Sequence, residues 1–278
     1  MEWKKLKNLI ILILLVVNGF LLVLVGSRRQ ESVKYERTAL EQTVQILARG
    51  GIEVDLDAIS SADGLAPMSV ERDLEREALL AQALLDEAVQ GDNRGGGLYL
   101  YQGRLGEVSF RSGGELSAEF EEDGHWSADR PERHAAELLK KLGVEGAHIS
   151  TAEEDGQTVV RFRQSWNGAA VFTCEVALIY RDGRLRSLSG VLLMAETGTA
   201  ESAGQILTLP TALMRFSEEI AGTGDVCSQL RSMEPGYRGT AQTLSGGAKL
   251  APVWLVSTDT AAYYLDCVTG VLTRLAEQ

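Results

Sequence analysis

Residues that could perform catalysis or bind a metal are sparse in this chain. Its three histidines, His125, His134 and His148, have no partner at metal-ligand spacing, and no H-E-x-x-H stretch occurs. The sequence also lacks a nucleophile elbow of the form G-x-S-x-G and a phosphate-binding G-x-x-x-x-G-K stretch. It therefore predicts a protein that is not an enzyme, with no catalytic residues, no cofactor and no metal site.

Three cysteines and two acidic runs complete the set of reactive side chains. Cys174, Cys227 and Cys267 are too few for a disulfide framework and lack C-x-x-C spacing, so we expect them to be buried small hydrophobic residues. The acidic runs at residues 121–123 and 153–155 could hold calcium loosely, but neither lies in an EF-hand loop. Charge runs of this kind are typical of solvated loops.

The strongest pattern in the sequence lies at its N-terminus. A basic tail at residues 1–7 precedes an apolar run at residues 9–25, interrupted only by Asn18 and Gly19. As a helix, this run would be roughly 25 Å long, close to the hydrocarbon thickness of about 30 Å. We therefore expect a cytoplasmic tail at residues 1–7 and a single transmembrane helix at residues 8–26. A cleaved signal peptide is the alternative, although the run is longer than a signal core and ends in a poor cleavage site.

Asn18 and Gly19 are the candidate partner-binding residues of this helix. An amide within an apolar helix seeks an interhelical hydrogen bond, and a neighbouring glycine lets two backbones approach closely. The alternative is that Asn18 is simply hydrated near the membrane interface. Basic residues flank the apolar run on both sides, so charge alone does not decide which end is cytoplasmic.

The composition restricts the class of partner. The formal net charge is -12, and an acidic domain repels phosphate backbones, so we expect no nucleic-acid partner. Glycine is abundant and proline scarce, which favours tight hairpins over a disordered stalk.

Beyond the N-terminal run, helical and strand patterns alternate. We expect helices at residues 35–49, 69–90, 131–142 and 209–220, the second with Ser69 as its N-cap. A hairpin with a turn glycine recurs at Gly103, Gly183 and Gly270, and Asn167-Gly168 is a further strong turn signal. In the last sheet we expect Trp254 and Leu265 to be buried and Gly270 to adopt a positive φ.

These elements predict an α+β fold, in which a single transmembrane helix precedes repeated helix-plus-antiparallel-sheet modules. The expected divisions are an N-terminal extracytoplasmic region at residues 27–128, a middle module at residues 129–200 and a C-terminal module at residues 205–278. The alternative to a true repeat is that the three hairpins resemble one another only because hairpins generally do.

Two stretches of the sequence are similar to a known family. The start, Met1-Glu-Trp-Lys-Lys-Leu-Lys7 leading directly into the apolar run, resembles the start of the YycI regulators. Residues 234–238, 250–254 and 263–270, with their P-V-W, Y-Y-L-D and T-G sequences, resemble the closing sheet of the YycI/YycH family. Similar C-terminal patterns occur in propeptide-type inhibitory modules, and residues 51–97 carry no matching motif.

The resemblance implies a function without catalysis. Members of this family are single-pass membrane proteins with a cytoplasmic N-terminus and an extracytoplasmic domain, and they associate with the WalK (YycG) sensor histidine kinase of Gram-positive bacteria. It thus implies a membrane-anchored regulator of cell-wall metabolism, with that kinase and a paralogous YycH-like regulator as partners. The alternatives are a structural or assembly protein of the cell envelope or divisome and, less favoured, a propeptide-like inhibitory module.

Overall fold

The computed structural model of this protein describes residues 2–121, 129–195, 197–202, 204–242 and 246–276. Strands account for 42% of the chain and helices for 27%. The helices are α1 (Glu2–Arg49), α2 (Leu74–Leu85), α3 (Pro131–Lys141) and α4 (Leu209–Thr223), with a short 3₁₀ helix, η1 (Leu56–Ala58). The strands are β1 (Glu53–Val54), β2 (Met68–Val70), β3 (Asp92–Gly95), β4 (Leu98–Gly103), β5 (Gly106–Phe110), β6 (Glu115–Phe120), β7 (Gly146–Glu154), β8 (Gln157–Trp166), β9 (Ala169–Arg181), β10 (Arg184–Val191), β11 (Thr199–Ala200), β12 (Gln229–Ala241), β13 (Ala248–Thr258), β14 (Ala262–Asp266) and β15 (Leu272–Arg274).

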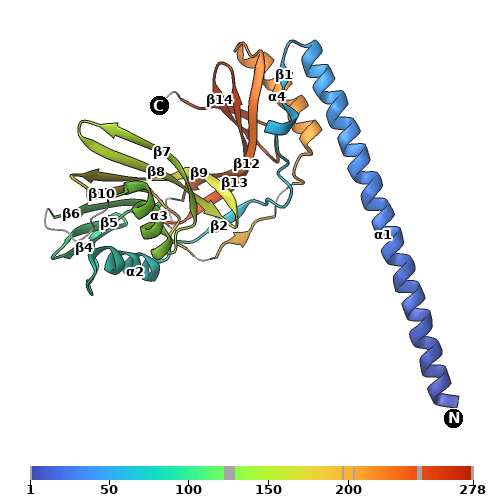
Figure 1. The fold of residues 1–278 in the computed structure, drawn as a ribbon, viewed down its shortest axis with the longest axis horizontal. Helices are drawn as coiled ribbons and strands as arrows, with labels where there is room; N and C mark the ends of the chain where they lie inside the picture. Colours follow the sequence, from blue (N-terminus) through green and yellow to red (C-terminus); the bar gives the residue numbers. More distant parts are fainter. Residues whose placement is uncertain (1, 122–128, 196, 203, 243–245, 277–278) are drawn as a thin grey trace.

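Helix α1 is one continuous element that projects from the rest of the molecule (Figure 1). It does not end at Gly26 but runs through the charged stretch that follows, where the sequence predicted a break between two helices. A lone glycine costs a helix only about 1 kcal/mol, and no proline or competing cap follows it. The helix ends at Arg49, the end that the sequence predicted for the helix at residues 35–49, and Gly50 and Gly51 follow directly.

The described strands form one mixed, branched sheet. Its main path runs β11-β2-β13-β12-β9-β10-β6-β5-β4-β3, with β7 and β8 branching from β9, and β14 and β15 branching from β13. Strands of the N-terminal, middle and C-terminal parts of the chain pair with one another: β6 with β10, β9 with β12 and β2 with β13. The sheet therefore crosses the boundaries that the sequence suggested between separate modules.

A short parallel contact joins the two halves of the sheet. Strands β9 and β12 pair at only two positions, Ala170 with Gly236 and Val171 with Tyr237. Gly236 permits this approach, because a Cβ there would lie 2.6 Å from the ring of Phe172 and 2.5 Å from the Ala170 carbonyl oxygen. The Thr173 hydroxyl extends the joint by accepting a hydrogen bond from the Gly239 amide, at 2.8 Å.

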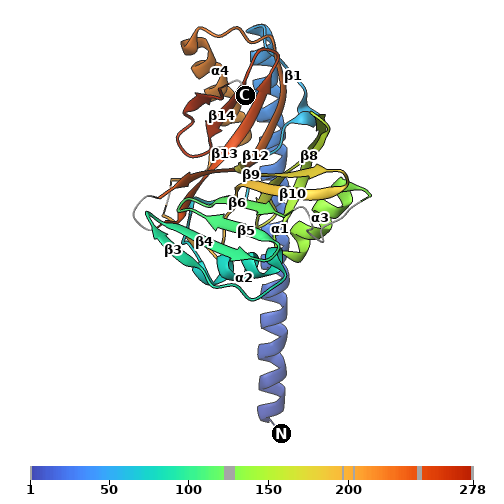
Figure 2. The ribbon, with the colours of Figure 1, turned by 90° about the vertical axis from the view of Figure 1, so that its left-hand side faces the viewer.

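Three apolar clusters pack against the sheet. Helices α2 and α3 cover the half built from β4–β6 and β8–β10, and the core there includes Leu84, Leu138 and Leu178. Helix α4 and the last turns of α1 cover the other half (Figure 2). A third cluster, which includes Trp166 and Tyr237, fills the joint between the halves.

The predicted fold class is wrong. The chain is mostly sheet, and that sheet is one large mixed array instead of separate antiparallel modules, each with its own helix. The physical reason is that strand edges of neighbouring segments satisfy one another's backbone groups. Within the described ranges, none of the helices combines the length and the apolar character that crossing a membrane requires. The α+β assignment with a transmembrane helix is therefore corrected.

The start of α2 also differs from the sequence prediction. Ser69 lies in strand β2, and the helix begins at Leu74. Asp73 is the N-cap, because its carboxylate accepts a hydrogen bond from the Arg76 amide at 2.9 Å. An aspartate caps a helix as well as a serine does, and the alternating residues before it pair as a strand.

Several turn predictions are confirmed. Asn167 and Gly168 both have positive φ, at 49° and 80°, as a two-residue hairpin turn requires. Gly183 and Gly270 also adopt positive φ, whereas Gly103 does not: it ends β4, and the unusual φ belongs to Gly106. Trp254 and Leu265 are fully buried, as predicted.

Candidate functional site

The predicted partner-binding residues lie on the projecting part of α1. Asn18 and Gly19 are exposed, and a Cβ added at Gly19 would have no atom within 4 Å. Ile11, Leu14 and Leu15 are exposed as well and share a helix face with Asn18, at spacings of three and four residues. We name Ile11, Leu14, Leu15 and Asn18 the α1 stripe. It offers apolar contact area and one amide to another molecule.

The other end of α1 is fastened to the domain. Leu47 is buried against α4, in the cluster that contains Phe216 and Trp254. The Thr43 hydroxyl is buried beside it and donates to the Ala39 carbonyl oxygen at 2.9 Å, so no polar group is left unpaired there. The last turns of α1 therefore pack directly on α4.

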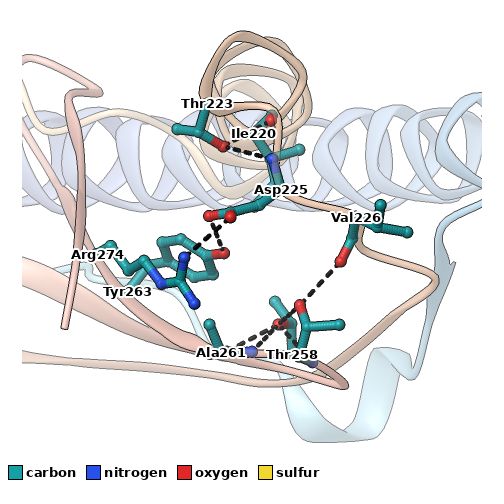
Figure 3. A network of polar contacts seen from close by, with 9 residues as sticks. Ile220, Thr223, Asp225, Val226, Thr258, Ala261, Tyr263 and Arg274 are labelled. Atoms are coloured by element: carbon teal, nitrogen blue, oxygen red, sulfur yellow. Dashed lines mark hydrogen bonds and ion pairs between the residues drawn. The ribbon is translucent and has the colours of Figure 1, made fainter. Parts of the chain in front are cut away.

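A polar network holds the end of α4 to the last two strands (Figure 3). Asp225, just after α4, accepts hydrogen bonds from the Tyr263 hydroxyl at 2.8 Å and from Arg274 Nη1 at 3.0 Å. Burial, and then the Asp225 carboxylate, raise the pKa of Tyr263 to about 12, so the phenol keeps its proton and remains the donor. One carboxylate thus joins β14 and β15 to α4.

A second set of hydrogen bonds holds the segment between Asp225 and β12. Thr260 donates its hydroxyl to the Val226 carbonyl oxygen at 2.8 Å. Asp259 accepts from the Ser228 hydroxyl at 2.5 Å and from the Gln229 amide at 3.2 Å. The Ser228 hydrogen bond, before other effects, lowers the pKa of Asp259. The connection from α4 into the sheet is therefore anchored at both ends.

The chain that follows α1 is anchored as well. The indole Nε1 of Trp254 donates to the Ser60 carbonyl oxygen at 2.9 Å, and the Ser60 amide donates to the Met233 carbonyl oxygen at 3.0 Å. Together with the Asp225 network, these contacts make a joint between α1, α4 and strands β12–β15. We name it the α1 joint.

The described histidines, cysteines and acidic residues do not come together in one site. His134 lies on α3 and His148 on β7, while His125 and residues 122–123 of the first acidic run lie outside the described residues. Cys174 and Cys267 are buried, as expected, whereas Cys227 is half-buried; all three are free thiols. Where side chains are described, no group of three or more His, Cys, Asp or Glu residues is arranged to hold a metal ion.

His134 is a half-buried hydrogen-bonding residue. Its Nδ1 lies 2.8 Å from the Tyr180 hydroxyl, and the two rings meet edge to face. Burial lowers the pKa of His134, and the smaller influence of Glu137 opposes this. A histidine that is less basic in the folded than in the unfolded state stabilises the fold fully above its unfolded pKa of about 6.5, and loses that contribution as the pH falls.

The free energy of unfolding should therefore decrease when the pH falls from about 7.5 to about 5.5, in part through His134. In His134→Gln, which cannot take up the proton, this decrease should be smaller. Urea unfolding at the two pH values measures the difference. Equal pH dependence in His134→Gln and wild type would contradict the assignment.

Sequence reasoning missed the residues of the α1 joint. Asp225, Tyr263 and Arg274 are far apart in the sequence and have no fixed spacing that marks a site. The only local signal was the Thr-Asp-Thr turn at residues 258–260, because such side chains bond to nearby backbone in turns.

Comparisons with known proteins found similarity to solved structures. No family model matches it, and no curated protein matches it. It is similar to an uncharacterized protein from Eubacterium rectale, at 14% identity over 81% of this chain and 90% of that one, with a TM-score of 0.48. It is also similar to the C-terminal domain of YpeB from Bacillus megaterium, at 14% identity over 75% of this chain and all of that one, with a TM-score of 0.35. These comparisons give no evidence for the YycI/YycH resemblance.

Proposed function

We propose that this protein is a non-enzymatic regulator that binds a sensor histidine kinase at the cell membrane and modulates its control of cell-wall metabolism. The observation that supports this most is the arrangement of α1, which carries the exposed α1 stripe at one end and is fixed in the α1 joint at the other. The finer assignment, to the YycI/YycH regulators of WalK with a YycH-like partner, rests on the resemblance of the sequence.

The α1 stripe fits an apolar helix of the partner. Ile11, Leu14, Leu15 and Asn18 follow the i, i+3, i+4, i+7 spacing by which one helix packs along another. Apolar area removed from water contributes roughly 25 cal/mol per Å², so covering these exposed side chains favours association. A single amide within such a seam adds register specificity, as buried asparagine does in coiled coils.

The α1 joint couples the proposed partner contact at the α1 stripe to the rest of the domain. Because α1 is one helix and its last turns are buried against α4, a partner that shifts the helix also shifts α4 and strands β12–β15. The predicted location, at the cell membrane with residues 1–7 in the cytoplasm and the main domain outside it, stays a prediction.

Co-purification of the sensor kinase tests the proposal. Full-length protein should recover the kinase, and Asn18→Leu should recover several-fold less, because a hydrogen bond contributes about 0.5–1.5 kcal/mol, or a factor of about 2–13 in affinity. Gln42→Leu is the matched control, since Gln42 is exposed on the same helix outside the α1 stripe. Equal recovery with Asn18→Leu would remove Asn18 from the interface, and no recovery with full-length protein would overturn the regulator proposal.

A further inference from the structure

A groove of about 770 Å³ lies between the two halves of the sheet, away from α1. One wall is the face of β13–β15 that points away from α4, where Leu255, Tyr264 and Thr273 lie side by side in register. The other wall is built from β8, β9 and β10 and includes Phe172. The volume is within the range of about 300–1,000 Å³ that ligand sites occupy.

Aromatic rings join the two walls. Phe172 and Tyr264 stack with their ring centroids 6.0 Å apart and an interplanar angle of 29°. The guanidinium of Arg163 lies over the Phe172 ring, 5.4 Å from its centroid. Phe172 is buried, so the apolar surface that this stack offers to a bound chain is the partly exposed ring of Tyr264, with the Arg163 cation nearby.

The charged side chains that line the groove are three arginines and one glutamate. Arg163 pairs with Glu175 at 2.6 Å, and Arg274 pairs with Asp225 at 3.0 Å. Arg238, half-buried on β12, has neither a hydrogen bond nor an ion pair to any side chain that the structure describes. Its charge, with those of Arg163 and Glu175, acts on Tyr264, whose pKa burial raises above the usual value. A cationic groove contrasts with the net charge of -12 on the whole chain.

We infer that this groove binds an extended acidic peptide segment of a partner protein, with a carboxylate on Arg238 and the neighbouring residues against Tyr264. An extended chain places alternate side chains on one side at intervals of about 7 Å, so it can present an acidic group while its backbone follows the groove. A half-buried arginine that lacks a partner among the described side chains gains a charge-assisted hydrogen bond from a carboxylate. The groove is separate from the α1 stripe, so its ligand is independent of the proposed kinase contact.

Fluorescence anisotropy with purified full-length protein tests the inference. The probes are a labelled nine-residue peptide of alternating glutamate and threonine and its counterpart with lysine in place of glutamate. The acidic probe should bind and the basic probe should not. Arg238→Glu should weaken binding of the acidic probe at least about tenfold, and Tyr264→Ala should weaken it as well. Arg238→Gln makes the same test without reversing the charge, should the glutamate variant fail to fold.

Arg231→Glu is the matched control, because Arg231 is exposed on the same strand outside the groove. It should leave binding of the acidic probe unchanged. Equal loss with Arg231→Glu and Arg238→Glu would show general electrostatic attraction and overturn the inference. Equal binding of the two probes, or no binding of either, would overturn it too. Free glutamate that displaces the acidic probe at equal concentration would show a site for a single carboxylate instead of a peptide.

Discussion

Replacing Trp254 by alanine should lower the free energy of unfolding by about 3–5 kcal/mol. The indole is 0% exposed and packs in the cluster beneath α4, and its Nε1 donates to the Ser60 carbonyl oxygen at 2.9 Å. The variant loses the buried apolar area and leaves a cavity, because the anchored strands around it can collapse only partly. It also leaves the Ser60 carbonyl without its donor. Urea unfolding followed by circular dichroism measures the effect.

Two variants separate the contributions at Trp254. Trp254→Phe keeps most of the volume and loses the hydrogen bond, so it should cost about 1–3 kcal/mol. Val226→Ala shortens an apolar side chain that is exposed, and should change stability by less than about 0.5 kcal/mol. If Trp254→Ala unfolds at the same urea concentration as Val226→Ala, Trp254 does not support the core.

Replacing Arg72 by methionine should cost about 3–5 kcal/mol, because it leaves the carboxylate of Glu77 buried without its partner. Arg72 Nε lies 2.6 Å from Glu77 Oε1, and Nη2 lies 2.9 Å from Oε2, with side-chain exposures of 10% and 1%. Arg72 also donates to the Gly97 carbonyl oxygen at 2.7 Å and lies over the Tyr99 ring. It therefore joins the start of α2 to β4.

The pH dependence of stability provides a second test of the Arg72→Met prediction, because it reports the protonation of Glu77. Burial already raises the pKa of Glu77 against the opposing influence of Arg72, and without Arg72 it should rise further. A carboxyl whose folded pKa lies above its unfolded pKa stabilises the fold at low pH and loses that contribution as the pH rises. The penalty of Arg72→Met should therefore be larger at neutral pH than near about pH 5.

A double variant and an exposed ion pair serve as controls for Arg72. Arg72→Met with Glu77→Met should recover much of the loss, because apolar side chains of similar volume can replace a buried pair. Arg133→Met breaks the exposed pair with Glu137 and should cost far less than Arg72→Met, because water screens an exposed ion pair. Equal costs for Arg72→Met and Arg133→Met would contradict the role assigned to burial.

The local features of the fold could be predicted from the sequence. The Asn167-Gly168 turn, the helix that begins at Pro131 and the burial of Trp254 depend on neighbouring residues or on a strong apolar pattern, and all are confirmed. The continuity of α1 through Gly26 and the cap at Asp73 were missed, because each depends on a small energy difference between local alternatives.

The sheet and the sites could not be predicted in the same way. The pairing of β9 with β12 depends on the close approach of Ala170 and Gly236, which no local sequence pattern predicts. The groove combines Arg163, Arg238 and Tyr264 from three strands, and each of these residues reads as an ordinary strand residue in the sequence. Asn18, by contrast, was visible as a polar residue in an apolar run, and its role in binding stays a prediction.

The length of α1 makes it a lever arm. Its 48 residues extend over roughly 72 Å, with the fixed end in the α1 joint and the N-terminal end far from the sheet (Figure 1). A rotation of about 5° at the joint would displace the N-terminal end sideways by about 6 Å. A repacking too small to disturb the core around Phe216 would thus be amplified into a lateral displacement of several ångströms at the far end of α1.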